Sequence, residues 1–152
     1  MALGGNVQME GIVDTIKTLV WQSQWDTGVA SIDNQHKKIL QAIKALNRTF
    51  DAQTDQPLVE KLFTALEAYA ALHFKFEETV MEKINYLGLA EQKKEHRTFI
   101  EHINRLHEES KDPKAFDVVL PRAQSYLMDW LLNHILEVDS QYKASFQKAG
   151  VK

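Results

Sequence analysis

The helical spacing of apolar residues constrains this 152-residue chain more than any other feature of its sequence. Only 6 glycines and 3 prolines interrupt the spacing, and between them apolar residues recur every three or four positions, as on one face of an α-helix. The pattern predicts four long helices. Because short connections favour antiparallel neighbours, we expect an all-α fold, an up-down antiparallel four-helix bundle.

Helix ends can be placed from capping and turn residues. The first helix is expected to begin near Ser31 to Asp33, which can cap it, and to end in "DAQTDQP". The second should start at Pro57 and stop at "NYLG", where Gly88 can take the left-handed conformation. The third should run from there to "SKDP". The fourth should start at about Pro113, with Pro121 either kinking it or marking its true start.

Each predicted helix carries one inward stripe of residues. The stripes are Ile32, His36, Ile39, Ile43, Leu46 and Phe50; Leu62, Leu66, Tyr69, His73, Phe76 or Glu77, Val80 and Ile84; Leu89, Gln92, His96, Phe99, Ile103 and Leu106; and Phe116, Leu120, Ala123, Leu127, Trp130 or Leu131, and His134. The bundle is expected to span residues 20–148, with an N-terminal arm or linker at 1–19 and a C-terminal tail at 149–152. The stretch "MEGIVDTIKTLVWQ" could make that arm amphipathic.

Composition excludes several functional classes. A net charge of −3 and the lack of a basic stripe with interleaved aromatics argue against nucleic-acid binding. No apolar run reaches the length of a membrane span, and the N-terminus lacks the apolar core of a signal peptide. The absence of cysteine excludes disulfides and thiolate metal sites. By elimination, a cytoplasmic location is expected.

Titratable residues stand on the inner stripes where leucine would be usual. His36, His73, His96 and His134 contribute one histidine from each helix, and Glu77 joins them. A single inward histidine is more often a hydrogen-bonded core residue, but a buried carboxylate among four imidazoles needs a cation to neutralise it. The set therefore predicts a metal site.

The spacing of these residues supports this prediction. His73 and Glu77 are four residues apart and share a helix face. Asp139 follows His134 by five residues, about 140° apart on an ideal helix, so that helix must loosen, bulge or end between them if both reach one site. Two carboxylates and several imidazoles without sulfur suit iron, manganese or zinc, and the ligands divide well between two metals. By contrast, we expect His102 and His107 at the surface, Glu78 solvated, and Trp130, Leu131 and Ile135 in the pocket wall.

Three motifs carry a family resemblance. "GVASIDNQHKKIL", "HFKFEETVM" and "WLLNHILEVDSQY" resemble the first-, second- and fourth-helix motifs of bacterial hemerythrin-like domains over about Val20 to Phe146. The resemblance implies a non-haem di-iron centre with an oxo or hydroxo bridge. It implies ligation by His36, His73, His96 and His134, with Glu77 and Asp139 as bridging carboxylates. It also implies dioxygen or small anions as ligands, and a fused or partner signalling domain as a further partner.

The third-helix motif departs from this family. Its pattern there is His-x-x-x-His, but the first position is Gln92, one turn before His96. Gln92 could ligate weakly, hydrogen-bond a water in the gap, or be a neutral replacement. We therefore interpret the chain as an oxygen- or redox-sensing module, with a reversible dioxygen carrier as the alternative. An enzyme such as a di-iron peroxidase, a metal-free interaction bundle and a ferritin-like protein fit the sequence less well, and we expect no enzymatic activity.

Overall fold

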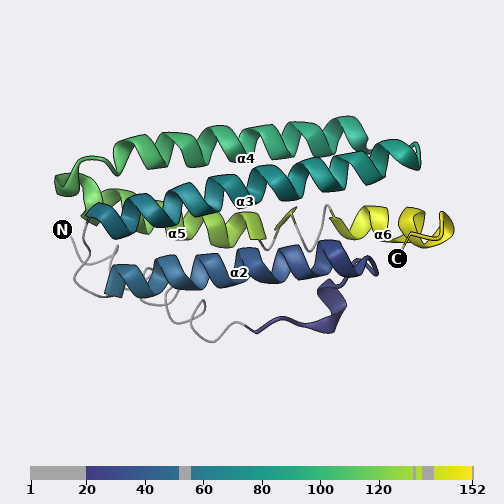
Figure 1. Ribbon diagram of the computed structural model, residues 1–152, viewed down its shortest axis with the longest axis horizontal. Coiled ribbons are helices and arrows are strands. Elements are labelled where there is room, and N and C mark those ends of the chain that lie inside the picture. Colours follow the sequence, from purple (N-terminus) through teal and green to yellow (C-terminus); the bar gives the residue numbers. More distant parts are fainter. Residues whose placement is uncertain (1–19, 52–55, 132, 135–138, 152) are drawn as a thin grey trace, which may run out of the picture.

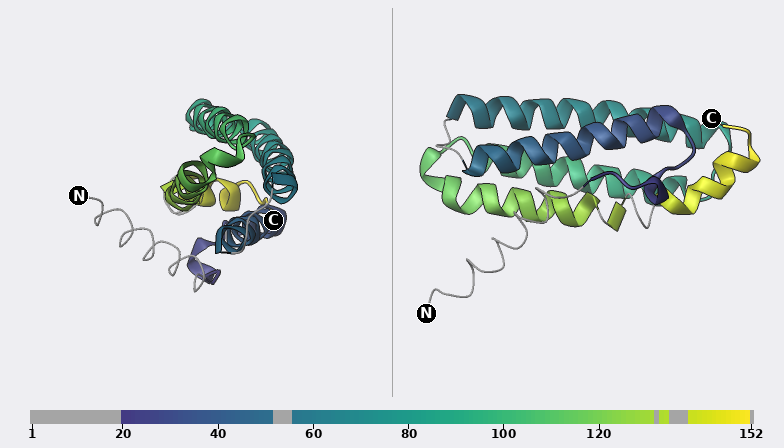
Figure 2. Two further views of the ribbon diagram at one scale, coloured as in Figure 1. Left: turned by 90° about the vertical axis from the view of Figure 1, so that its left-hand side faces the viewer. Right: turned by 90° about the horizontal axis from the view of Figure 1, so that it is seen from below.

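The computed structural model describes residues 20–51, 56–131, 133–134 and 139–151. Their elements are η1 (Ser23–Trp25), α2 (Ala30–Asp51), α3 (Gln56–Lys83), α4 (Leu89–Glu109), η2 (Pro113–Ala115), α5 (Phe116–Trp130) and α6 (Asp139–Lys148). Three long rods, α2, α3 and α4, run antiparallel, and α5 with α6 lies along the fourth edge (Figure 1). Seen end-on, the four rods surround one core (Figure 2). The predicted all-α four-helix bundle is confirmed, while the N-terminal arm lies outside the described residues.

The fourth rod differs from the single helix expected. It consists of α5 and α6, and the described residues that follow α5, Leu131, Asn133 and His134, have π-helical backbone. A π-helical segment widens the helical turn and is frequent at functional sites. The loosening or end of the helix expected between His134 and Asp139 falls on residues 135–138, which lie outside the described residues; α5 itself ends before His134, at Trp130, and α6 starts at Asp139.

Local side-chain chemistry sets the helix starts. Asp33 does not cap α2 as expected; its buried Oδ1 accepts hydrogen bonds from Thr27 N at 2.7 Å and Thr27 Oγ1 at 2.8 Å, which fixes the turn before the helix. Gly28 in that turn has φ of 86°, a conformation that favours glycine. Pro57 stands in the first turn of α3, as predicted.

One turn prediction was wrong. After α3 the left-handed residue is Asn85, with φ of 53°, and not Gly88. Gly88 instead precedes α4 with negative φ, and a Cβ there would lie 2.5 Å from the Tyr86 ring, so lack of a side chain is what the position requires. Pro121, expected either to kink the fourth helix or to mark its start, lies inside α5, five residues after Phe116, so of these two alternatives it does not mark the start.

The inward face of α3 is rotated from the predicted stripe. Phe63, Ala70, Phe74 and Met81 are buried beside the expected Leu66, His73 and Glu77, whereas Phe76 is 37% exposed. Helix α3 has 28 residues, and apolar residues occur around more than one of its faces, so periodicity alone does not single out the buried face. The stripes of α2, α4 and α5 are buried largely as predicted; the side chains of Leu46 and Phe50 lie outside the described set.

Two apolar clusters divide the core along the bundle. The larger cluster includes Ile39, Phe74, Phe99 and Trp130, and the smaller cluster comprises Val29, Ile32, Met81, Tyr142 and Phe146. On each rod the predicted polar residues lie between the two clusters. A residue of the larger cluster is on one side of them, and a residue that belongs to the smaller cluster or packs against it is on the other. A buried polar layer therefore separates two apolar ones. No described helix has the length and hydrophobicity that crossing a membrane would require.

Candidate metal centre

Six polar side chains form the buried layer between the two apolar clusters. All six are 2% exposed or less: His36, His73, Glu77, Gln92, His96 and His134. They come from α2, α3, α4 and the π-helical segment after α5, because the inward stripe of each rod carries them at the same height. The structure thus brings these predicted residues together.

His36, His73 and Glu77 form the first group. The Nε2 atoms of His36 and His73 are 3.0 Å apart, and Glu77 Oε2 lies 3.1 Å from His73 Nε2. One ligand atom from each residue lies within 4.8 Å of the others, a spacing at which one metal ion could be held.

Glu77, His96 and His134 form the second group, and one ligand atom from each of them again lies within 4.8 Å of the others. His96 Nε2 lies 3.6 Å from Glu77 Oε2, and the rings of His96 and His134 have centroids 5.1 Å apart. Glu77 belongs to both groups. A carboxylate shared in this way is suited to bridging two ions.

Two outward hydrogen bonds fix which ring nitrogen faces the layer. His73 Nδ1 donates to Gln35 Oε1 at 2.6 Å, and His96 Nδ1 donates to Glu78 Oε1 at 2.8 Å. Amide and carboxylate oxygens only accept, so in each neutral ring the proton is on Nδ1 and a lone pair is on Nε2. Both Nε2 atoms are directed at Glu77, itself an acceptor. Facing lone pairs repel unless a cation or proton lies between them, so these donors fit a metal ion.

The carboxylate of Glu77 provides a second test of fit. Both oxygens are buried, and neither accepts a hydrogen bond of good geometry from the described residues, although Oε2 is close to His73 and His96. A buried carboxylate without hydrogen-bond donors costs several kcal/mol, on the order of that for other unpaired buried charges. A cation at this point would offset that cost. Nitrogen and oxygen donors without sulfur suit iron, manganese or zinc.

Gln92 occupies the inner position predicted for it. It is 1% exposed and lies one turn before His96 on α4. Its burial in the polar layer distinguishes it from an exposed, neutral replacement. Asp139 begins α6, but its side chain lies outside the described residues, as does the whole of Ile135.

Aromatic rings enclose the second group. The Phe74 ring stacks on His96 at 4.0 Å, and the Trp130 ring stacks on His134 at 4.4 Å. Trp130 and Leu131, expected in the pocket wall, are buried in the larger apolar cluster. The rings restrict the orientation of both histidines and give each of them an apolar neighbour.

Sequence reasoning missed Gln35 as a partner and misplaced Glu78. Glu78 was expected to be solvated, but its side chain is 25% exposed and holds His96. Burial raises the pKa of Glu78, and the neighbouring Lys93 opposes that rise. Gln35 precedes His36 and Glu78 follows Glu77, so each lies about 100° around its helix from the inward face. At that angle a long side chain can reach a histidine on the next helix, which is the signal that could have identified both.

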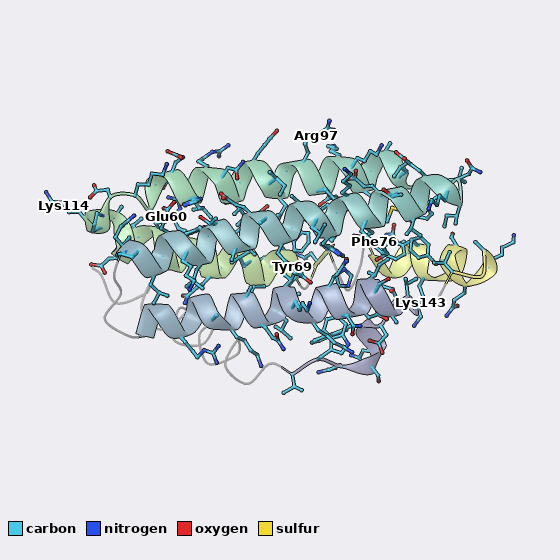
Figure 3. All side chains as sticks on the ribbon, viewed as in Figure 1. Glu60, Tyr69, Phe76, Arg97, Lys114 and Lys143 are labelled. Carbon is cyan, nitrogen blue, oxygen red and sulfur yellow. The ribbon has the colours of Figure 1, made fainter. Side chains whose placement is uncertain are left out.

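The prediction for His107 was also wrong. His107 is 9% exposed, stacks on Phe63, and lies between Glu67, whose Oε1 is 2.9 Å from Nδ1, and Glu60, whose Oε2 is 2.9 Å from Nε2. Figure 3 places Glu60 toward the end of the bundle where Lys114 lies, away from Phe76. His102 is half-buried and stacks on Tyr126 at 3.8 Å.

Two surface grooves reach the second group from opposite sides of α4. One lies between α3 and α4 and is lined by His96, Glu78, Phe74 and three basic residues, Lys75, Lys93 and Arg97. Arg97 points outward from α4 in Figure 3. The other lies between α4 and α5 and is lined by His134, Trp130, Tyr126 and two acidic residues, Glu95 and Asp129.

Comparison with known proteins bears on this arrangement. A family model described as the hemerythrin HHE cation binding domain matches residues 27–145. The chain is 36% identical over 126 residues to bacteriohemerythrin from Pseudomonas aeruginosa, covering 82% of this chain and 78% of that protein. It is 32% identical over 125 residues to bacteriohemerythrin from Methylococcus capsulatus, covering 82% and 93%.

More distant and structural matches agree. Myohemerythrin from Sipunculus nudus is 30% identical over 124 residues, covering 82% of this chain and 90% of that protein. A crystal structure of wild-type hemerythrin superposes with a TM-score of 0.71 at 29% identity, covering 84% of this chain and 97% of that chain.

Proposed function

This chain belongs to the hemerythrin family of cation-binding domains, and from that premise we propose that it is a non-haem di-iron protein that responds to dioxygen or redox state. The observation that carries the proposal is the pair of buried His and Glu groups that share Glu77. His36 and His73 would hold one iron, and His96 and His134 the other. Glu77 and Asp139 would bridge them. A bridged di-iron centre supplies an exchangeable position at which dioxygen or a small anion binds.

The sensing role is inferred from Gln92. An amide oxygen donates more weakly to a metal than an imidazole does, so the iron held by His96 and His134 would be more open to water, anions and oxidation. A centre that oxidises readily is suited to reporting oxygen or redox state, and less to prolonged carriage. The alternative is reversible dioxygen carriage or storage. It is favoured by the four inward histidines, which keep the positions of the family motifs.

Metal analysis tests the centre itself. Protein produced with ample iron should contain about two iron ions per chain, since two groups share one carboxylate. A ratio near one in a correctly folded protein would contradict the two-metal assignment. Absorption spectra of the reduced protein, taken anaerobically and then during exposure to air, would report whether the iron responds to dioxygen.

Gln92→His separates sensing from carriage. The substitution places an imidazole on the inward stripe, so the reduced variant should be oxidised by air several-fold more slowly than the parent and should take up dioxygen reversibly for longer. Stopped-flow absorption after mixing with oxygen measures both. Gln41→His, at an exposed position of α2, is the matched control and should leave the kinetics unchanged. Equal oxidation rates for parent and Gln92→His would remove the main support for sensing and favour the carrier.

A further inference from the structure

A chain of aromatic rings connects the candidate metal centre with the protein surface. Trp130 stacks on His134 with centroids 4.4 Å apart and planes inclined by 13°. Phe99 lies between Trp130, at 4.3 Å, and Tyr126, at 5.9 Å, and Tyr126 stacks on His102 at 3.8 Å. Every step is therefore a ring contact between described residues of α4, α5 and the π-helical segment.

Two rings of this chain border a surface groove. Tyr126 and Trp130 line the groove between α4 and α5 together with His134 (volume about 450 Å³), a size that suits a small molecule. Glu95 and Asp129 also line it, and among the described residues that line it there is no lysine or arginine. Charge complementarity thus favours a positively charged occupant.

We propose that Trp130 and Tyr126 form a path for single electrons between this groove and the candidate centre, and that the groove accepts a small, positively charged one-electron donor. The inference rests on the proposed di-iron function, because a module that is oxidised by dioxygen must be reduced again before it can respond a second time. Two donor molecules each lose one electron, the two iron ions together gain them, and no bond of this chain forms or breaks.

Indole and phenol rings are the side chains best able to mediate electron transfer, which distinguishes this groove from the basic one. The basic groove offers Phe74 and the His96–Glu78 hydrogen bond, and would favour an anionic donor.

The buried N–H of Trp130 finds no acceptor among the described residues. Its proton therefore has no base to accept it in the part of the chain that the structure describes, and Trp130 is suited to passing electrons without being left as a deprotonated radical.

Docking can be tested without iron. The redox-inert, paramagnetic cation hexaamminechromium(III) is added to the zinc-loaded, isotope-labelled protein, and line broadening of backbone amides is recorded by NMR. Broadening should centre on Thr98, Asp129 and Asn133 and should be lost in the double variant Glu95→Gln, Asp129→Asn. Broadening spread over other acidic surfaces, or unchanged in the double variant, would contradict a cation site in this groove. This result does not depend on whether the iron centre forms.

Electron transfer is tested with the oxidised, iron-loaded protein. Its reduction by cationic hexaammineruthenium(II) and by anionic ferrous EDTA is followed by stopped flow, and the ratio of the two rate constants is compared among variants. A shift in the potential of the centre changes both rates in the same direction, so the ratio isolates the route of the electron.

The ratio of the two rate constants should fall about tenfold in the charge-neutralised double variant at low ionic strength. It should also fall clearly in Tyr126→Leu. Tyr69→Leu, a tyrosine on α3 outside the path (Figure 3), should leave the ratio unchanged. An unchanged ratio in both groove variants would overturn the proposal, whereas failure to load two iron ions would instead contradict the di-iron function.

Discussion

Buried histidines meet glutamates at two places in this bundle, and the two arrangements differ in what the ring nitrogens face. At the end of the bundle marked by Glu60, both ring nitrogens of His107 face carboxylates, Glu67 on one side and Glu60 on the other. In the central layer, His73 and His96 are held from outside through Nδ1, and their Nε2 atoms are directed inward at Glu77.

The difference separates a structural histidine from a ligand-like one. The two carboxylates favour the charged imidazolium of His107, which then has no lone pair for a metal. Gln35 and Glu78, which hold His73 and His96 from outside, leave a lone pair facing the core, beside a carboxylate that accepts no hydrogen bond of good geometry from the described residues. The carboxylates also differ in burial, since Glu77 is fully buried whereas the side chains of Glu60 and Glu67 are 45% and 25% exposed. The orientation of the ring nitrogens and the burial of the carboxylate together indicate metal binding in the central layer.

Substitution of Glu77 should have the largest effect on the unfolding free energy, and the sign of this effect should depend on whether metal is bound. Glu77→Met should remove both metals and lower the unfolding free energy of the metal-loaded protein by about 3–4 kcal/mol, the loss expected when a tightly bound ligand is removed. In the metal-free protein the same variant should be more stable than the parent by about 1–3 kcal/mol, because a buried carboxylate is replaced by an apolar side chain of similar volume.

Denaturant unfolding with and without metal measures both effects, and metal analysis gives the content. Glu101→Met, at an exposed position of α4, is the control and should change neither by much. If Glu77→Met retains both metals, Glu77 is not a shared ligand. If it destabilises the metal-free protein, the carboxylate has partners that the central layer does not show.

Loss of Glu78, which holds His96 from outside the layer, should have the next largest effect, and this effect is on metal affinity. Glu78→Ala should weaken binding of zinc by about 10–100-fold, because the ring of His96 loses the acceptor that fixes its tautomer. Glu78→Gln keeps an acceptor and should lie closer to the parent. Competition titrations with a chelator measure the affinity, and Glu82→Ala, also on α3 but paired with Lys93 and not with a histidine among the described residues, serves as control. Equal losses for Glu78→Ala and Glu82→Ala would reduce the role of Glu78 to surface charge.

The sequence was sufficient for the bundle and for the inward position of five of the six candidate ligands. Helical spacing defines the rods, and polar residues at inward positions identify the layer, because both depend on period and burial within one helix. The role of Glu78 and the burial of His107 depend on which neighbouring helix lies beside each residue, and a single helix does not encode that. The two-part fourth rod lies between these cases: the spacing of His134 and Asp139 predicted an interruption after His134, whereas the π-helical backbone that the structure describes begins earlier, at Leu131.

The smallest effect is expected at His107, as a dependence of stability on pH. Burial alone would lower the pKa of His107, but the hydrogen bond and charge of Glu67, with those of Glu60, outweigh it, so the pKa of His107 is raised above its ordinary value near 6.5. A raised folded-state pKa means that the stabilisation is fully present below the unfolded pKa and is lost as pH rises through the folded pKa. His107→Gln should therefore lower the unfolding free energy by about 1 kcal/mol at pH 5.5 and by less at pH 9. The expected loss is small because Glu60 is partly exposed and water screens its charge.

His102 is the matched control for that pH dependence because its shift has the opposite sign. Burial, with the charges of Arg105 and Arg122, lowers the pKa of His102. Its contribution should therefore be larger at high pH and decline as pH falls, so His102→Gln and His107→Gln should give opposite slopes. Urea unfolding of the parent and both variants across this pH range measures the slopes, and differences from the parent cancel the titration of all other groups. Parallel slopes would mean that His107 is not held as an imidazolium, and the contrast between a doubly paired histidine and the inward-facing ones would lose its electrostatic basis.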